Sequence, residues 1–410
     1  MKVLYNESTK FPVRVWLDRI EDMEESCLEQ AYHLANLPFL HKWACLMPDT
    51  HTGMGMPIGG VIATKGVIIP NAVGVDIGCG MAFVQTDIPL ALVKDISTGN
   101  GSLIQAVVGD IMRNIPVGYL HRKTKMESHI LDEAFDNLNL YQRDTPLMEH
   151  LQDGYYQLGT LGGGNHFIEI QVDDEGFLAI MLHSGSRHVG KQVCDYFHAI
   201  AREHNSRWFS QVPDAHRLAF LPVDTEDGRQ YLNWMNLCLN FAEENRQTML
   251  REVEAIFSRY VEKYTGQTPS FSMEINCHHN YAALEHHYGE DVWVHRKGAT
   301  RAMAGELAVI PGAMGSYSYV VRGLGCPESF CTSSHGAGRK YSRKGAMEAF
   351  STEQVMVDLK NQGVILGKKN KSDVAEESRF AYKDIDVVMN HQRDLVEPVK
   401  RLRTVGVVKG

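Results

Sequence analysis

The chain has 410 residues, of which 44% are hydrophobic and 22% are charged, so it is long enough to bury a large core. It contains no run of about 18 apolar residues, and its start lacks the profile of a signal peptide, so we expect no membrane partner and a cytoplasmic location. The formal net charge of −9 excludes a protein that binds nucleic acid only through positive charge over its whole surface.

Any attraction to a nucleic acid would therefore be local. Four basic stretches could supply it, at 121–125, 296–301, 339–344 and 400–403, although a solvated surface is the better interpretation of any one of them. The eight cysteines are scattered and form no CxxC, so we expect neither a disulfide framework nor a structural zinc ribbon.

In chain order, the first element that the pattern predicts is a helix from Glu24 to Leu37, where apolar residues recur at helical spacing before a proline. Short strands are predicted at Gly66 to Ile69, Ala82 to Gln85 and Phe177 to His183, because each is apolar and bounded by turn residues. A long helix is predicted from Arg229 to Lys263, and its apolar stripe is more typical of a core than of a cofactor site.

Further strands are predicted at Val292 to His295, Ser318 to Arg322 and Val405 to Val408. A capping box at Ser351 predicts a helix that ends near Gly363. Strands and helices therefore mix without a regular βαβ alternation, which favours an α+β fold over a doubly wound sheet. No repeat or linker divides the chain, so we expect one compact domain, 1–410, with mixed sheets, peripheral helices and a helical segment at about 190–264.

The first motif that could carry out chemistry is the glycine-rich turn from Gly74 to Gly80. It carries Asp76 and Cys79 three residues apart, and the glycines allow a backbone tight enough to point both side chains at one centre. A carboxylate beside a thiolate suits a borderline metal ion, and one sulfur can bridge two ions. Taken alone, a structural turn with a buried cysteine is an equally good interpretation.

The second motif, from Gly159 to Glu169, places four glycines before Asn165, His166 and Glu169. Its backbone N–H groups could cradle a phosphate, although the Walker pattern is absent. The strand that follows ends at His183, close to Arg187. A histidine there could hold a metal ion while the guanidinium binds a phosphate.

Two further motifs contain histidines. In Asn276 to Asn280 two histidines are adjacent, so we expect one ligand and one structural residue because neighbouring strand residues face opposite ways. His278, together with His286 and His287, is assigned a structural role. His335 differs because it lies beside a Gly-Ala-Gly turn and an arginine, where a phosphate could approach the imidazole closely.

The motifs together resemble those of one family. GVDIGCG, GTLGGGNHFIEI, LHSGSR, NCHHN, RKGATRA, PGAMG, SSHGAGR, AYKDID and the terminal KG occur in the order and rough spacing of RtcB-type RNA ligases, over nearly the whole chain. The resemblance implies an RtcB-like catalytic domain that uses GTP and two Mn²⁺ ions. Its RNA substrates would carry a 3′-phosphate or 2′,3′-cyclic phosphate and a 5′-hydroxyl, and an archease-like activator is a possible partner.

The resemblance also implies roles for individual residues. His335 would be the catalytic nucleophile that becomes guanylylated, and Arg187 would hold an RNA phosphate. The metal ligands would be Asp76 and His166 for one ion, His183 and His279 for the other, with Cys79 bridging both. The guanylate pocket would use Asn165, His166, Phe167, Ile168, Glu169, His279, Asn280, Pro311, Gly312, Ala313, Met314, Ser318, His335, Gly336, Ala337, Gly338, Tyr382 and Lys409.

Other functions remain open at this point. The same residues would serve an enzyme that caps 3′-phosphate ends with GMP, or a cyclic phosphodiesterase that joins ends poorly. A non-catalytic RNA-binding relative is disfavoured, because it would not need two metal sites and a nucleophile.

Three residues depart from the family pattern. Met54 and His188 stand where Lys and Gly are usual, and Ala313 replaces a hydroxyl residue of the guanylate pocket. A lost neutral hydrogen bond costs about 0.5–1.5 kcal/mol, so Ala313 should weaken GTP binding without abolishing it. Met54 and His188 bear more on the path of the RNA, and they suggest a substrate in RNA repair instead of tRNA splicing.

Overall fold

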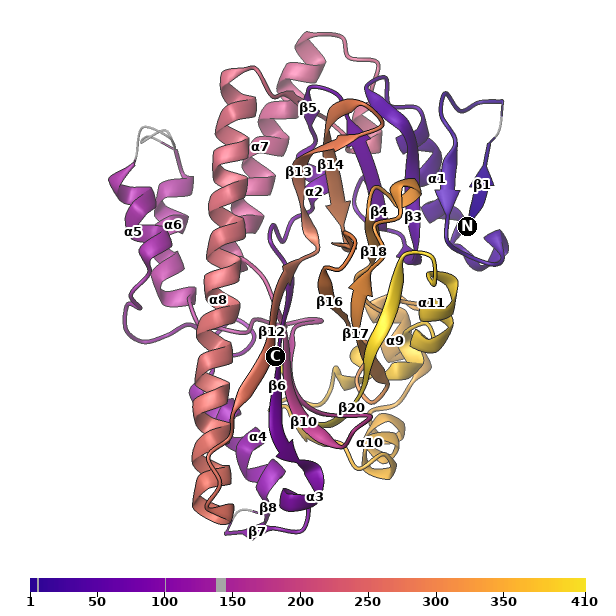
Figure 1. Cartoon of the computed structure of the whole chain (residues 1–410). Helices are drawn as coiled ribbons and strands as arrows, with labels where there is room; N and C mark the ends of the chain where they lie inside the picture. Colours follow the sequence, from indigo (N-terminus) through magenta and orange to yellow (C-terminus); the bar gives the residue numbers. More distant parts are fainter. Residues whose placement is uncertain (6, 100, 138–144) are drawn as a thin grey trace.

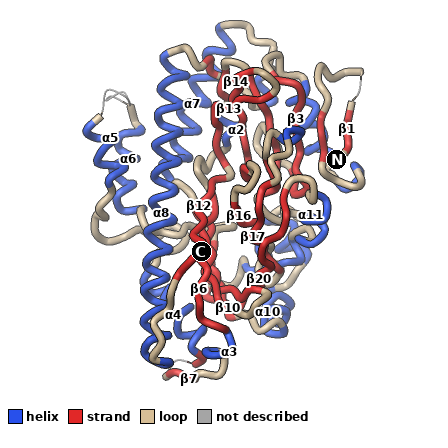
Figure 2. Tube along the Cα trace, in the orientation of Figure 1, coloured by secondary structure: helices blue, strands red, loops and turns tan. Residues whose placement is uncertain are grey.

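Two large sheets form the centre of the molecule, with helices around them (Figures 1 and 2). The computed structural model describes residues 1–5, 7–99, 101–137 and 145–410. The six-stranded sheet has the order β1 (Lys2–Leu4), β2 (Val13–Val15), β3 (Leu40–His51), β4 (Ile58–Thr64), β14 (Glu290–Lys297) and β13 (Asn280–His287). Its strands pair antiparallel except β2 with β3.

The eight-stranded sheet positions most of the predicted site residues. Its order is β12 (Phe271–His278), β6 (Gly80–Pro89), β10 (Phe177–Ser184), β9 (Phe167–Asp173), β20 (Val396–Lys409), β17 (Tyr317–Gly323) and β16 (Leu307–Ile310), with β19 (Ile365–Gly367) parallel to β20. The register aligns Met81, His183, Phe167 and Lys409 across four neighbouring strands. Residues far apart in the sequence therefore meet at one end of this sheet.

Three small two-stranded sheets complete the β structure. They pair β5 (Val67–Ile68) with β11 (Leu221–Pro222), β7 (Ser97–Thr98) with β8 (Gly101–Ser102), and β15 (Ala299–Arg301) with β18 (Thr332–Ser334). Every strand that the sequence predicts is present, although β5 is shorter than expected and β6, β14 and β20 are longer.

The helices lie on both sides of the sheets (Figure 2). They are α1 (Glu25–Ala35), α2 (Pro70–Val73), α3 (Leu90–Val93), α4 (Leu103–Asn114), α5 (His129–Asp136), α6 (Leu147–Gln157), α7 (Arg187–Arg207), α8 (Glu226–Thr265), α9 (Arg343–Ala349), α10 (Thr352–Asn361) and α11 (Ile385–His391). Short 3₁₀ turns lie at Ile20–Asp22, Asp214–His216, Pro327–Ser329, Val374–Glu377 and Arg379–Ala381. Helices and strands mix without regular alternation, which confirms the α+β class.

The helix predictions are confirmed with shifted ends. The long helix α8 extends the expected range by a few residues at both ends, from the Thr225 side-chain cap to Gly266, whose φ is 72°. The segment expected at about 190–264 contains α7 and α8, joined by residues 208–225, which include a 3₁₀ turn and β11. The Ser351 hydroxyl accepts a hydrogen bond from the Gln354 N–H at the start of α10. Within the described residues, no helix combines the length and apolar character needed to cross a membrane.

The basic stretch at 296–301 is buried at Arg296 and Lys297, which corrects both interpretations offered for these two residues, whereas Arg301 is exposed and pairs with Glu306. Arg296 is fully buried and pairs with Glu285 at 2.5 Å, and Lys297 is buried with its ammonium bonded to the Met54 and Asn71 carbonyls. A buried arginine needs such a partner because an unpaired charge in the interior is costly. Arg296 therefore links β14 to Glu285 of β13.

Candidate active site

Five side chains that the sequence predicts as metal ligands meet at one point. Asp76 and Cys79 lie in the turn between α2 and β6, His166 precedes β9, His183 lies near the end of β10, and His279 connects β12 to β13. The turn is closed by the Gly78 N–H, which donates to the Asn280 carbonyl, and Gly78 has a φ of 77°. Glycine is required at position 78 because that backbone conformation strains any other residue.

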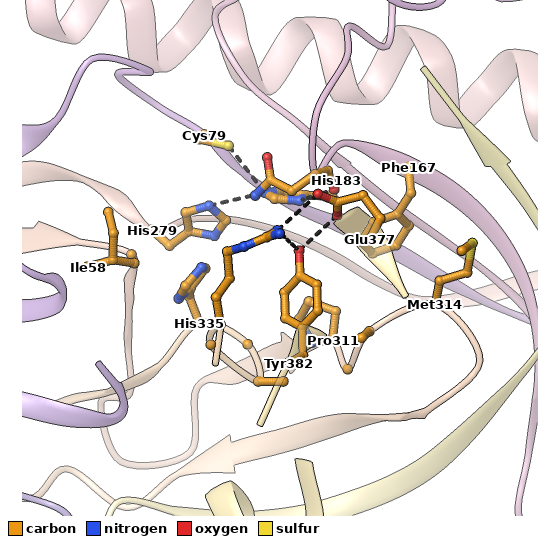
Figure 3. A pocket seen from close by; sticks show the side chains of 18 of the residues that line it. Ile58, Cys79, Phe167, His183, His279, Pro311, Met314, His335, Glu377 and Tyr382 are labelled. Carbon is orange, nitrogen blue, oxygen red and sulfur yellow. Dashed lines mark hydrogen bonds and ion pairs between the residues drawn. The ribbon is translucent and has the colours of Figure 1, made fainter. Parts of the chain in front are cut away.

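The donor atoms form two groups that share the Cys79 sulfur. In one, Cys79 Sγ lies 3.2 Å from His183 Nε2, which is 3.3 Å from His279 Nε2 (Figure 3). In the other, Cys79 Sγ lies 3.4 Å from His166 Nε2, which is 3.2 Å from an Asp76 oxygen. The ligand atoms within each group all lie within 4.8 Å of one another. This arrangement suits two metal ions joined by one sulfur.

Hydrogen bonds orient the imidazoles of His166 and His183 so that Nε2 of each ring points toward Cys79. His166 Nδ1 donates to the Leu161 carbonyl at 2.9 Å, and His183 Nδ1 donates to the Asn165 carbonyl at 3.2 Å. Because a carbonyl can only accept, each Nε2 keeps its lone pair toward Cys79. A second Asp76 oxygen, Oδ1, is buried without a hydrogen-bond partner, as expected of an atom that awaits a cation.

Burial sets the protonation of this centre. It lowers the pKa values of His183 and His279 well below the ordinary value, with neighbouring histidines adding to the effect, so both rings are neutral as metal binding requires. Burial, followed by the Asp76 charge, raises the pKa of the Cys79 thiol. A thiolate at Cys79 therefore needs a bound cation, and the residues present fit a dinuclear metal site.

His335 lies beside this centre and is held by an acid that the sequence analysis missed. Its ring is 4.7 Å from that of His279, and its Nδ1 donates to Asp49 Oδ2 at 2.7 Å. The same oxygen accepts the backbone N–H groups of His335 and Gly336 at 3.2 and 3.3 Å. Asp49 is fully buried in β3, so this carboxylate fixes both the ring and the loop. In the neutral ring, the lone pair is then on Nε2.

A cavity of about 280 Å³ opens from the metal-binding residues past His335 (Figure 3). Most of the residues expected in the guanylate pocket line it: Asn165, Phe167, Glu169, His279, Asn280, Pro311, Gly312, Ala313, Met314, His335, Gly336, Ala337, Gly338, Tyr382 and Lys409. Its size is near the lower end of the ~300–1,000 Å³ usual for small-molecule sites.

Three residues of the expected pocket do not line the cavity. His166 faces Cys79, and Ile168 packs in the core with Ile170. Ser318 is buried behind the cavity wall, where its hydroxyl accepts the Gly312 N–H at 3.1 Å.

A second acid missed by the sequence analysis holds one end of the cavity together. Glu377 accepts the Lys409 ammonium and the Arg339 guanidinium, each at 3.0 Å, and the Tyr382 hydroxyl at 2.8 Å (Figure 3). Burial opposes its charge, but Lys409 and Arg339 more than compensate and lower its pKa. At the same end, burial raises the pKa of Glu169 to about 7. Paired cations and acids here can recognise a polar, planar ligand.

The predicted phosphate residue Arg187 lies beside the metal-binding side chains but does not line the cavity. Its guanidinium is 3.3 Å from the Thr160 hydroxyl and 3.4 Å from His166 Nδ1, and it covers Gly162, where a side chain would collide with it. Arg187 itself has a φ of 59° at the start of α7. It therefore faces the Asp76 side of the centre.

His278 and His286, and two of the three departures from the family pattern, lie away from the cavity. His278 turns from His279 and bonds the Gly78 carbonyl, while His286 is exposed and pairs with Asp291. Met54 and His188 are exposed and absent from the cavity wall, whereas Ala313 lines it.

A family model described as tRNA-splicing ligase RtcB matches residues 30–410. The chain belongs to the RtcB family. It is 39% identical to the RNA-splicing ligase RtcB of Escherichia coli K12, with 97% of each chain covered. It is 34% identical to the tRNA-splicing ligase RtcB of Thermococcus kodakarensis, covering 99% of this chain and 96% of the relative. The RtcB relative of Mycobacterium bovis, an RNA-splicing ligase, is 31% identical over 93% of this chain.

Proposed function

We propose that this protein is an RNA ligase that depends on GTP and Mn²⁺. It joins an RNA end carrying a 3′-phosphate or a 2′,3′-cyclic phosphate to a 5′-hydroxyl end. The observation that carries the proposal is the pair of donor groups sharing Cys79, with His335 oriented beside them by Asp49. The names of the RtcB relatives support the same reaction class.

In the first step His335 Nε2 attacks the α-phosphorus of GTP, an N–P bond forms, and pyrophosphate leaves. A neutral imidazole is a competent nucleophile near pH 7. The Asp49 carboxylate holds the Nδ1 proton and stabilises the positive charge that develops on the ring. The guanylate occupies the cavity between Phe167 and Tyr382, where Glu169 and Lys409 can bind the base edge.

Asp76, His166 and Cys79 would hold one Mn²⁺, and Cys79, His183 and His279 the other. When bound, the two ions neutralise phosphate oxygens and so favour in-line displacement. Arg187 supplies a fixed positive charge for an RNA phosphate on the Asp76 side.

In the later steps the guanylate passes to RNA. An oxygen of the 3′-phosphate attacks the guanylate phosphorus, the N–P bond breaks, and His335 regains its lone pair. The 5′-hydroxyl then attacks the RNA phosphorus, loses its proton, and releases GMP. A 2′,3′-cyclic phosphate must first be opened by water to a 3′-phosphate. An archease-like protein is proposed as an activator of this reaction.

The proposal is tested by incubating the protein with α-labelled GTP and Mn²⁺, denaturing it, and then supplying RNA ends. We expect label to stay on the denatured chain, to pass to a 3′-phosphate RNA, and to leave as GMP when a 5′-hydroxyl strand is added. Transfer to RNA without joining would support the capping enzyme instead. A protein that never holds label and only opens cyclic phosphates would contradict the ligase assignment.

Asp49→Asn is expected to slow guanylylation by about 10²–10⁴-fold. An amide can donate to Nδ1 and would leave the proton on Nε2, the nitrogen that has to attack. GTP binding should change little, because Asp49 is not among the cavity-lining residues. Single-turnover labelling at saturating GTP measures the rate. An unchanged rate, or a loss confined to GTP affinity, would remove Asp49 from this positioning role.

A further inference from the structure

A group of histidines lies on the outer surface next to the metal-binding residues, outside the cavity. His188, exposed on the first turn of α7, contacts the His150 ring of α6 edge-on, with centroids 5.1 Å apart. His121 lies in the loop between α4 and α5, and Lys191 lies one turn farther along α7. We call these four residues, with the exposed Tyr119 of the same loop, the histidine patch.

The patch gathers groups that can carry positive charge, three imidazoles and the Lys191 ammonium, although the protein is acidic. Partial burial lowers the pKa of His188, and the charges of His150, Lys191 and His121 add to that effect, so all three lie near its ring. Asp153 of α6 opposes them, and Asp195 pairs with Lys191 at 2.5 Å. The N-cap residue of α7, Ser186, makes no side-chain hydrogen bond, although Gln157 Oε1 accepts the His188 N–H at 3.0 Å. The positive end of the helix dipole lies at the same place. An anion placed between these rings would relieve their repulsion.

The patch is continuous with the metal-binding residues. Arg187 immediately precedes His188, and its guanidinium lies 3.4 Å from His166 Nδ1. The loop that carries Tyr119 is fastened to the glycine motif, because the Gly118 N–H donates to the Gly162 carbonyl at 2.8 Å. A polyanion that leaves the metal-binding residues past Arg187 therefore meets the histidine patch next.

Tyr119 adds a second kind of recognition. Its side chain is fully exposed, whereas the backbone on both sides is held by Gly162 and by the Tyr156 carbonyl, which accepts the Arg122 N–H at 2.8 Å. Because the backbone of this loop is already restrained by hydrogen bonds, another ring can stack on Tyr119 at little cost in backbone conformational entropy. Unpaired bases offer such rings, while the bases of a duplex are already stacked.

We propose that the histidine patch binds the single-stranded segment of the RNA substrate next to the reacting end, with the imidazoles and Lys191 holding phosphates and Tyr119 stacking on a base. The inference rests on the proposed function and adds a binding track to it. It gives His188, which departs from the family pattern, a role in the path of the RNA.

The test measures binding of a short fluorescein-labelled single-stranded RNA by anisotropy, without GTP. For the native protein we expect affinity to rise as the pH falls from about 8 to about 6, the range in which histidines gain their charge. In a triple variant, His121→Gln, His150→Gln and His188→Gln, affinity should fall about tenfold at the lower pH, and its pH dependence should disappear. His286→Gln is the matched control and should bind as the native protein does, because His286 is an exposed histidine of β13 that pairs with Asp291 of β14.

The stacking contact is tested separately. Tyr119→Ala should weaken binding roughly tenfold, whereas Tyr119→Phe should keep it, because stacking needs only the ring. Thermal melting verifies that each variant is folded. Unchanged affinity and pH dependence in the folded triple variant would overturn the proposal, as would equal affinity for duplex and single-stranded RNA. Absence of guanylate label on the native protein would instead refute the proposed function, and the binding measurement would still decide on the patch.

Discussion

Replacing His335 by alanine is expected to abolish covalent retention of the guanylate. No other imidazole in the described residues combines a place on the cavity wall, contact with the metal-binding histidines and a buried carboxylate at Nδ1. The measurement is the amount of label left on the denatured chain after incubation with α-labelled GTP and Mn²⁺. His286→Ala serves as the control, because that histidine is exposed on β13 and away from the cavity.

The informative contrary result would be label that survives in His335→Ala. His51 would then be the next candidate, since it also lines the cavity. Its Nδ1 donates to the Asp49 backbone carbonyl at 3.0 Å, and burial lowers its pKa to about 4, so the ring is neutral. A carbonyl carries no net charge to balance a developing imidazolium, whereas the Asp49 carboxylate does so for His335. That difference is why we assign the nucleophile to His335.

Much of the fold and most of the site could be predicted because the signals are local. The apolar periodicity of α8 and the alternation of the strands follow from helix and strand geometry. Alternation could also have predicted which residues of β9 face the cavity, since Phe167 and Glu169 line it while Ile168 between them packs in the core.

The two acids that organise the cavity could not be predicted in the same way. Asp49 meets His335 across 286 positions of sequence, and the Glu377 partners come from three separate segments. Neither carboxylate lies in a glycine motif or at a recognised ligand spacing. The one local signal for Asp49 is a charged residue in the stretch 44–50 of β3, which is buried throughout. Pairing over such distances is set by sheet topology, which periodicity alone does not specify.

The basic stretches also show that sequence composition does not specify what a charged side chain contacts. At 339–344, Arg339 is engaged by Glu377 and Arg343 lines the cavity, while Lys400 pairs with Asp173. Composition reported charge, but whether that charge faces solvent, a ligand or a buried acid depended on the fold.

Cys79→Ala is expected to weaken binding of both Mn²⁺ ions, by more than about tenfold each, because Cys79 Sγ is the only donor common to the two groups among the described residues. Asp76→Ala should weaken one ion and leave the other nearly unchanged, since its carboxylate belongs to a single group. Cys45→Ala, which removes a buried thiol from the core far from the donors, is the control for the loss of a cysteine.

Titration calorimetry with Mn²⁺ on the three variants separates a bridging sulfur from two independent sites. If the sulfur bridges both ions, Cys79→Ala should lower the affinity for both of them, and neither of the other two variants should. If Cys79→Ala lost one ion and kept the other at native affinity, the sulfur would be a ligand of one metal, and the second group would need a donor from water or substrate. In that case the 3.4 Å separation of Cys79 Sγ and His166 Nε2 would be a contact of packing and not of shared coordination.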